Sequence, residues 1–193
     1  LAETGHAYAV TVTDPTAAAW ALTALASKTS VPVNAAAVQS VTGTDHAELS
    51  ALYAAGSAGR ITGLGNEAVT AAAALSLAEA NDLASKTTGV VTAFISNTAL
   101  ADYAALTETG NTYAFHIADT AIDAAALRAL DGRTTALVIL TATDPITVSG
   151  VYADVHAVLT SGGIFGWSSP SVTLTAPVTA AQANTLAGLT SGI

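Results

Sequence analysis

The chain has 193 residues, of which 51 % are hydrophobic and only 10 % are charged. Its 14 acidic and 5 basic residues give a net charge of −9. This excess of acid argues against binding to nucleic acid or anionic membranes, because both depend on clustered Lys and Arg. The absence of Cys excludes disulfides and thiolate chemistry. No apolar run reaches the roughly 18 residues of a membrane span, so we expect no membrane insertion.

One pattern recurs seven times along the chain: a β-rich run, then Asp, Thr or Ser, then an Ala-rich amphipathic helix with a Gly- or Thr-containing exit. The predicted helices are Thr16–Lys28, Asp45–Ala55, Ser76–Ser85, Thr98–Leu106, Thr120–Leu130, Ser149–Leu159 and Thr179–Leu189. Their starts lie 22 to 31 residues apart. That spacing is typical of one coil of an α/β solenoid.

The predicted strands precede the helices, and the clearest are Tyr8–Thr13, Tyr113–Ala118, Ala136–Thr143 and Val172–Thr175. The β-then-α order with short links predicts parallel strands and right-handed crossovers. Val31–Gly43 can hold two short strands, which leaves a β-solenoid-like cross-section open beside one like that of leucine-rich repeats. We therefore predict an α/β fold: one right-handed repeat solenoid of about seven coils over residues 1–193.

The chain also contains a weak internal duplication, of residues 1–105 with 106–193. Leu1–Thr29 aligns without a gap on Leu106–Thr134, with 13 identical positions. Such self-similarity is typical of repeat proteins rather than of one-domain enzymes. Because neither end looks capped, we expect the chain to be part of a longer protein.

A resemblance to a known group of proteins rests on Ile61–Thr70 (ITGLGNEAVT), which follows Val41–Thr44 and precedes Leu83–Gly89 (LASKTTG). These segments resemble the Ala/Thr-rich repeat modules of very large cyanobacterial and other bacterial cell-surface proteins. The match is strongest over Val41–Gly89. The resemblance implies an extracellular or cell-surface location and a structural or adhesive role, and it supplies no catalytic residues.

Four acidic residues follow strand-like runs and precede helices: Asp14, Asp45, Asp119 and Asp144. Helix N-capping explains that position, because a carboxylate accepts hydrogen bonds from the free amides of the first turn. Calcium, which takes six to eight oxygen ligands, is the alternative. The sequence has no EF-hand loop and no calcium β-roll repeat. We therefore expect no cofactor and keep calcium as a candidate ion.

The four histidines, His6, His46, His116 and His156, fall in separate coils, and none has a second His at the spacing of a zinc-binding helix. No Ser lies in a nucleophile elbow. The glycines of Gly63–Gly65 fit a tight corner better than a phosphate-binding loop. Because acids and bases do not cluster along the sequence, we expect no catalysis. A polysaccharide-active enzyme on a β-helix is the least favoured hypothesis.

Two further patterns concern surfaces. Three T-x-T units, at residues 11–13, 141–143 and 173–175, place hydroxyls on one strand face and could order water in an ice-binding row. Ordinary β-propensity of Thr is the alternative.

The segment Gly162–Pro170 interrupts the strand–helix repeat. Its aromatic side chains either fold over the core, or Phe165 and Trp167 form an exposed anchor for a neighbouring subunit.

The expected function follows from uncapped coil ends. A solenoid with open ends exposes unpaired backbone and apolar layers, which a second copy can cover. We expect a structural module of an extracellular filament, surface layer or matrix that self-associates end to end or laterally. Its interface residues would be Phe165, Trp167, Leu1 and Ile193. An adhesin that binds glycan or ice on one solenoid face is the alternative.

Overall fold

The computed structural model describes residues 5–97, 99–142, 145–167 and 169–190. Its chain divides into two compact units, Leu1–Phe94 and Ile95–Ile193. The described residues form an α/β fold with six α-helices and one short 3-10 helix, and the strand pairs are parallel. None of these helices combines the length and the apolar character needed to cross a membrane.

The first unit alternates short strands with helices. In chain order it contains β1 (Thr16–Ala18), α1 (Ala19–Lys28), β2 (Val33–Asn34), β3 (Ser40–Gly43), α2 (His46–Ser57), β4 (Ile61–Thr62), β5 (Ala68–Ala71), α3 (Leu77–Ala84) and β6 (Val91–Ile95), whose last residue belongs to the second unit.

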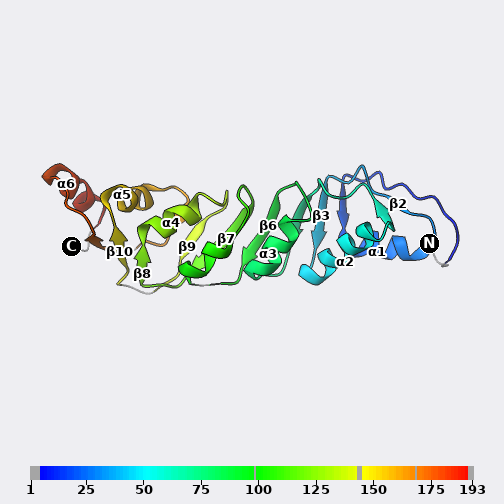
Figure 1. The fold of residues 1–193 in the computed structure, drawn as a ribbon, viewed down its shortest axis with the longest axis horizontal. Helices are drawn as coiled ribbons and strands as arrows, with labels where there is room; N and C mark the ends of the chain where they lie inside the picture. The colour runs from blue at the N-terminus through cyan, green and yellow to red at the C-terminus, as the bar shows by residue number, and fades with distance from the viewer. Residues whose placement is uncertain (1–4, 98, 143–144, 168, 191–193) are drawn as a thin grey trace. The chain divides into compact units, whose positions relative to one another are not determined.

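Its strands form two parallel ladders. In one, β1 pairs with β3, β3 with β5, and β5 with β6, so that Val41, Val69 and Val91 stack in register and are fully buried. In the other, β2 pairs with β4 through Val33 and Ile61. Figure 1 shows α1, α2 and α3 in a row along these strands, and α2 packs on both α1 and α3.

The second unit repeats the arrangement with the 3-10 helix η1 as its first helical element. It contains η1 (Leu100–Ala105), β7 (Thr112–Ile117), β8 (Ala121–Asp123), α4 (Ala124–Asp131), β9 (Val138–Leu140), β10 (Thr147–Gly150), α5 (Tyr152–Thr160), β11 (Ile164–Phe165), β12 (Ser171–Leu174) and α6 (Ala180–Leu189).

Two parallel ladders again form the core of this unit. β7 pairs with β9 and β9 with β11, which aligns the buried side chains of Phe115, Val138 and Ile164. β8 pairs with β10 and β10 with β12, with Ile122 opposite Val148. In this unit β8, β10 and β12 each precede a helix, and α4 packs on η1 and α5.

The helix predictions agree with the structure at all seven positions. η1 is a 3-10 helix within the predicted Thr98–Leu106, and the other six are α-helices. Three α-helices begin three or four residues later than predicted: α1 at Ala19, α4 at Ala124 and α5 at Tyr152. The preceding residues are strands instead: Thr16–Ala18 pairs with β3, Ala121–Asp123 with β10, and Ser149–Gly150 with β12. Here the parallel ladder outweighs the helix propensity of an Ala-rich sequence.

The strand predictions are mixed. β7 and β12 confirm two of them, and β9 occupies only the centre of Ala136–Thr143. The predicted strand Tyr8–Thr13 is wrong, because only Thr11 forms a bridge, with Asn34. Within the described residues β2 is just two residues long, so it offers this segment little backbone to pair with. The suggestion that Val31–Gly43 holds two short strands is confirmed by β2 and β3.

Candidate functional site

The predicted acidic residues do not converge on one site. Asp45 is the N-cap of α2, where its Oδ1 accepts a hydrogen bond from the Glu48 amide at 2.9 Å. Asp119 does not cap the helix that follows it. Its Oδ2 accepts from the amide of Leu100, the first residue of η1, at 2.6 Å. Asp123, which the sequence analysis missed, caps α4 by accepting from Ala126 at 2.8 Å.

Asp14 does not cap α1, whose N-cap is Ala18. Asp14 is exposed, and no donor among the described residues contacts its carboxylate. Asp144 lies outside the described residues. In the part of the chain that the structure describes, no group of three or more His, Asp or Glu side chains is placed to hold a metal ion. The calcium hypothesis thus gains no site from these residues.

A polar cluster that the sequence analysis did not foresee lies between α2 and α3. His46 Nε2 lies 3.0 Å from Asp82 Oδ2, and Lys86 Nζ lies 3.3 Å from Asp82 Oδ1. His46 Nδ1 faces Glu79 Oε1 at 3.8 Å. Partial burial would raise the pKa of Asp82, but hydrogen bonds from His46 and Lys86 outweigh it and lower that pKa. The cluster ties α2 to α3.

The geometry of this cluster differs from that of a catalytic triad. Ser50 Oγ lies 3.0 Å from His46 Nε2, the same ring nitrogen that meets Asp82. In a triad the nucleophile and the acid engage opposite nitrogens of the imidazole, so that one orients the ring while the other exchanges a proton. Here both groups share one nitrogen. The arrangement is suited to holding the two helices, with Asp82 and Ser50 bonded to a single His.

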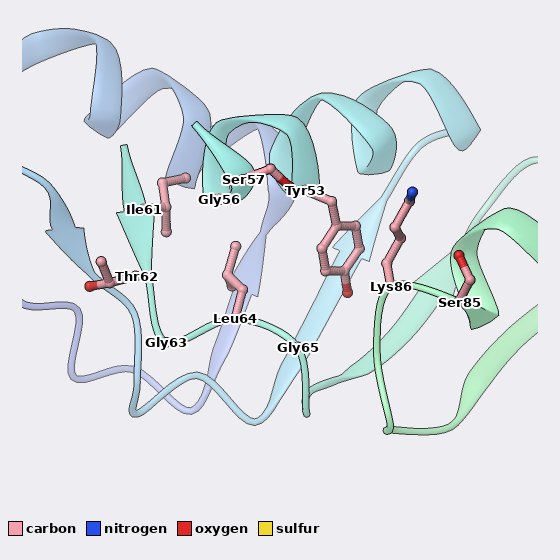
Figure 2. Close-up of a pocket in the computed structure, with 10 residues that line it drawn as sticks. All are labelled: Tyr53, Gly56, Ser57, Ile61, Thr62, Gly63, Leu64, Gly65, Ser85 and Lys86. Atoms are coloured by element: carbon pink, nitrogen blue, oxygen red, sulfur yellow. The ribbon is translucent and has the colours of Figure 1, made fainter. Parts of the chain in front are cut away.

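An open pocket of about 510 Å³ lies beside the loop that joins β4 to β5. Figure 2 shows the ring of Tyr53 pointing from α2 toward the loop at Gly65, with Lys86 on the adjoining segment. Gly63 has a φ of +85°, and a Cβ there would lie 2.6 Å from the Ala36 backbone. This glycine is therefore required by the tight corner, as the sequence predicts for Gly63–Gly65.

Glu67 holds this loop from inside, a role that the sequence analysis missed. Its side chain is fully buried. Oε2 accepts hydrogen bonds from the amides of Gly65 at 2.7 Å and Asn66 at 3.1 Å, while Oε1 accepts one from the Tyr53 hydroxyl. Burial, followed by the contact with Glu67, raises the pKa of Tyr53. The only sequence signal for this role was an acid directly after the glycine-rich turn.

The predicted interface residues have different surroundings. Phe165 lies on β11 and is 52 % exposed, whereas Trp167 is half-buried, and its Nε1 has no partner among the described residues. Leu1 and Ile193 lie outside the described residues. The most exposed aromatic residue in the described part, Trp20 on α1 at 62 %, was not foreseen. Its spacing within an Ala-rich helix gave no sign of which face it would occupy.

In the described residues, two of the three T-x-T units have no threonine beside them in their ladders. Thr11 lies beside Asn34, and Thr173 lies beside Ser149, so neither has a Thr neighbour in its ladder. Thr143 lies outside the described residues. Another row of threonines is present on β3, β5 and β6, where Thr42, Thr70 and Thr92 are in register and point outward.

Two further hollows lie on the first and last coils. One, of about 420 Å³, is lined by residues of Val10–Thr13 together with β1 and α1. The other, of about 340 Å³, lies between β12 and α6.

Comparisons of the chain with protein-family models, with curated proteins and with solved structures gave no match.

Proposed function

We propose that this chain is a structural module of an extracellular assembly, a right-handed α/β solenoid that extends by stacking coil on coil. The observation that carries the proposal is the parallel pairing of strands from one coil to the next. Thr16 pairs with Ser40 and Ser40 with Ala68 in the first unit, and Ala121, Thr147 and Ser171 do the same in the second. A ladder of this kind can be extended by any further coil of similar shape.

Side chains that join successive coils add support. Glu48 on α2 accepts a hydrogen bond from the amide of Trp20 on α1 at 2.8 Å, and Arg128 on α4 contacts Asp154 on α5 at 2.8 Å. These contacts join adjacent helices, as a stacked scaffold requires. The polar groups of the His46 cluster serve the same purpose between α2 and α3.

The end strands supply the means of association. β1 and β12 each stand at one end of their sheets. Edge strands carry unpaired backbone groups that favour association with another chain. Phe165, on the end strand β11, adds an exposed aromatic side chain of the kind that anchors interfaces. An end-to-end contact that does not close generates a filament.

Negative-stain electron microscopy of the purified chain at rising concentration tests this function. We expect elongated particles or sheets that lengthen with concentration. Compact single particles at every concentration, with no growth after prolonged incubation, would contradict a self-assembling role.

A surface-binding adhesin is the second candidate, supported by the outward row of Thr42, Thr70 and Thr92. Regular hydroxyls on a sheet can face a repetitive ligand such as a glycan or ice. Adsorption of the monomer to polysaccharide or to growing ice, abolished by Thr70→Val but not by Thr120→Val, would favour this candidate over the scaffold. Thr120 is a suitable control because it is exposed and its hydroxyl contacts no partner among the described residues.

A further inference from the structure

The duplication in the sequence is reproduced in detail by the structure. Thr29 Oγ1 accepts a hydrogen bond from the Tyr8 amide at 3.0 Å and donates one to the Tyr8 carbonyl at 2.7 Å. Thr134 Oγ1 makes the same two contacts with Tyr113, at 3.0 and 2.7 Å. The first coil, which contains Tyr8 and α1, is therefore the counterpart of the coil that contains β7, β8 and α4.

The two equivalent coils differ in what covers them. Tyr113 is fully buried, whereas Tyr8 is 41 % exposed. The same contrast holds for the other residues on this side: Phe115, Ile117, Ile122 and Leu130 are buried, while their counterparts Val10, Val12, Ala17 and Leu25 are only partly buried. On the other side of the two helices burial does not differ, since the equivalent residues Leu22 on α1 and Leu127 on α4 are both buried. Among the described residues, nothing covers this side of the first coil in the way that its counterpart is covered.

In the counterpart that cover is a helix of the preceding coil. η1 packs on α4, and the ring of Tyr103 meets Phe115 edge-on with centroids 4.8 Å apart. The groove between the two helices is lined from η1 by Leu100 and from α4 by Ala126. The amide of Leu100 then donates to Asp119, which fixes the start of η1 on the coil below.

The first coil has a surface equivalent to the one that η1 covers on α4, but no described helix lies on it. Its hollow, which we call the first-coil surface, is lined by Val10, Val12, Asp14, Ala17, Ala21 and Leu25. Ala21 stands where the counterpart has Ala126. Asp14 stands where the counterpart has Asp119, and no described donor contacts it. A helix placed on this surface would bury its apolar residues and present its first amides to Asp14.

In the last coil, α6 has an uncharged and largely apolar surface that suits the first-coil surface. Its hollow, which we call the last-coil surface, is lined by Val172, Leu174, Ala183, Asn184, Leu186, Ala187 and Thr190. None of these residues is charged, so no like charge would face Asp14. In ladder register, Val148 is buried but Val172 is partly exposed, which marks this side as uncovered.

The first turn of α6 also has backbone amides that can donate hydrogen bonds to a carboxylate. Its capping box uses the amides of Thr179 and Gln182, at 2.9 and 3.2 Å. The box makes no use of the amides of Ala180 and Ala181, which lie at the positive end of the helix dipole. An aspartate from another chain is a suitable partner for them.

We propose that the first-coil surface binds the last-coil surface of a second copy, head to tail, with α6 of one copy seated on α1 of the next and Asp14 at the start of α6. The proposal rests on the proposed function and specifies its contact. It takes the packing of η1 on α4 as its template.

Cysteine cross-linking tests this contact, and the chain is suited to it because it has no Cys of its own. Two single variants, Ala21→Cys and Ala187→Cys, place one thiol on each surface with little change in volume. Oxidation of their mixture is expected to give a disulfide-linked heterodimer, while each variant alone stays uncrosslinked. Ala54→Cys, exposed on α2, replaces Ala21→Cys in the control mixture and should give no heterodimer.

The outcomes separate this proposal from the function on which it rests. If the unmodified chain assembles in the microscope but the mixture of Ala21→Cys and Ala187→Cys gives no more heterodimer than the control, the head-to-tail contact is wrong and the scaffold function stands. Homotypic cross-links of either variant alone also overturn it, since they require a symmetric contact. If the chain does not assemble at all, the function itself fails.

A second measurement concerns Asp14. Asp14→Asn removes the charge that faces the start of α6, and we expect it to weaken self-association about fivefold, as a charge near a helix terminus does. Glu108→Gln, which removes an exposed carboxylate from the loop before β7, is the matched control and should have no effect. Equal affinities of Asp14→Asn and the unmodified chain would show that Asp14 does not contact α6.

Discussion

The Tyr53 hydroxyl donates a hydrogen bond to the carboxylate of Glu67, and this pair closes the loop between β4 and β5 from the inside. Glu67 is fully buried and accepts two further hydrogen bonds, from the amides of Gly65 and Asn66. A buried carboxylate is tolerated because three donors surround it. The loop therefore depends on this acid as well as on its glycines.

Glu67→Ala is expected to lower the free energy of unfolding by about 3 kcal/mol, because it leaves two backbone amides and a phenol without their acceptor. Tyr53→Phe removes one donor of the three and should cost about 1 to 2 kcal/mol. Urea unfolding of the single and double variants measures both losses. Strict additivity of the two would contradict a direct contact, since residues in one network are coupled.

Asp45 and Asp14 form a matched pair for testing helix capping. Asp45→Ala should lower the free energy of unfolding by about 1 kcal/mol, because Asp45 caps α2 through the Glu48 amide. Asp14→Ala should leave the stability of the monomer unchanged, since no described residue donates to that carboxylate. Thermal unfolding at low protein concentration compares them. An equal loss in both variants would contradict these assignments.

Acid should destabilise the fold through Glu48 and Glu79. Hydrogen bonds from Thr44 lower the pKa of Glu48, and those from Ser76 lower the pKa of Glu79, both from an ordinary value of 4.5. A group whose pKa is lower in the folded state stabilises it above the unfolded pKa. We therefore expect this contribution to be complete above about pH 4.5 and to be lost as the pH falls through the lowered values.

The measurement is the melting temperature as a function of pH for Glu48→Gln and for the unmodified chain. The variant should show a shallower fall below pH 4.5, because its amide no longer titrates. Glu108→Gln, at an exposed position, serves as the charge-matched control. Curves of identical slope for Glu48→Gln and the unmodified chain would exclude a role for Glu48 in acid unfolding.

Removal of calcium should have no effect on stability. The carboxylates of Asp45 and Asp119 are engaged by backbone amides, and the described residues bring no group of three acids together. We expect the same melting temperature in excess chelator and in millimolar calcium. A fall in chelator that calcium reverses would establish a bound ion and would reopen the assignment of these acids.

The helices of this fold could be predicted from the sequence because of their apolar stripes, and α2, α3, α4 and α6 also have side-chain caps. Leu49, Leu52 and Tyr53 are buried as their spacing predicts, and Ser76 and Thr179 begin their helices with capping boxes. The short strands could not be placed in the same way. A two-residue strand such as β4 has no periodicity of its own and is defined by its ladder partner β2.

The candidate surfaces were less accessible to sequence reasoning, because they depend on contacts between coils. His46 and Asp82 are 36 residues apart, and only the packing of α2 on α3 brings them within 3.0 Å. Asp119 was expected to cap the helix after it, but it reaches back to η1. The duplication did point to equivalent coils, and comparison of Tyr8 with Tyr113 then identified the uncovered side.

The most direct test of the central claim is the sedimentation velocity of the chain at rising concentration. We expect the sedimentation coefficient to increase with concentration for the unmodified chain and for Ala54→Glu. It should stay at the monomer value for Ala21→Glu, whose added charge lies in the same first-coil surface as Asp14. A coefficient that stays at the monomer value for the unmodified chain at every concentration would contradict the claim that this protein is a self-assembling scaffold.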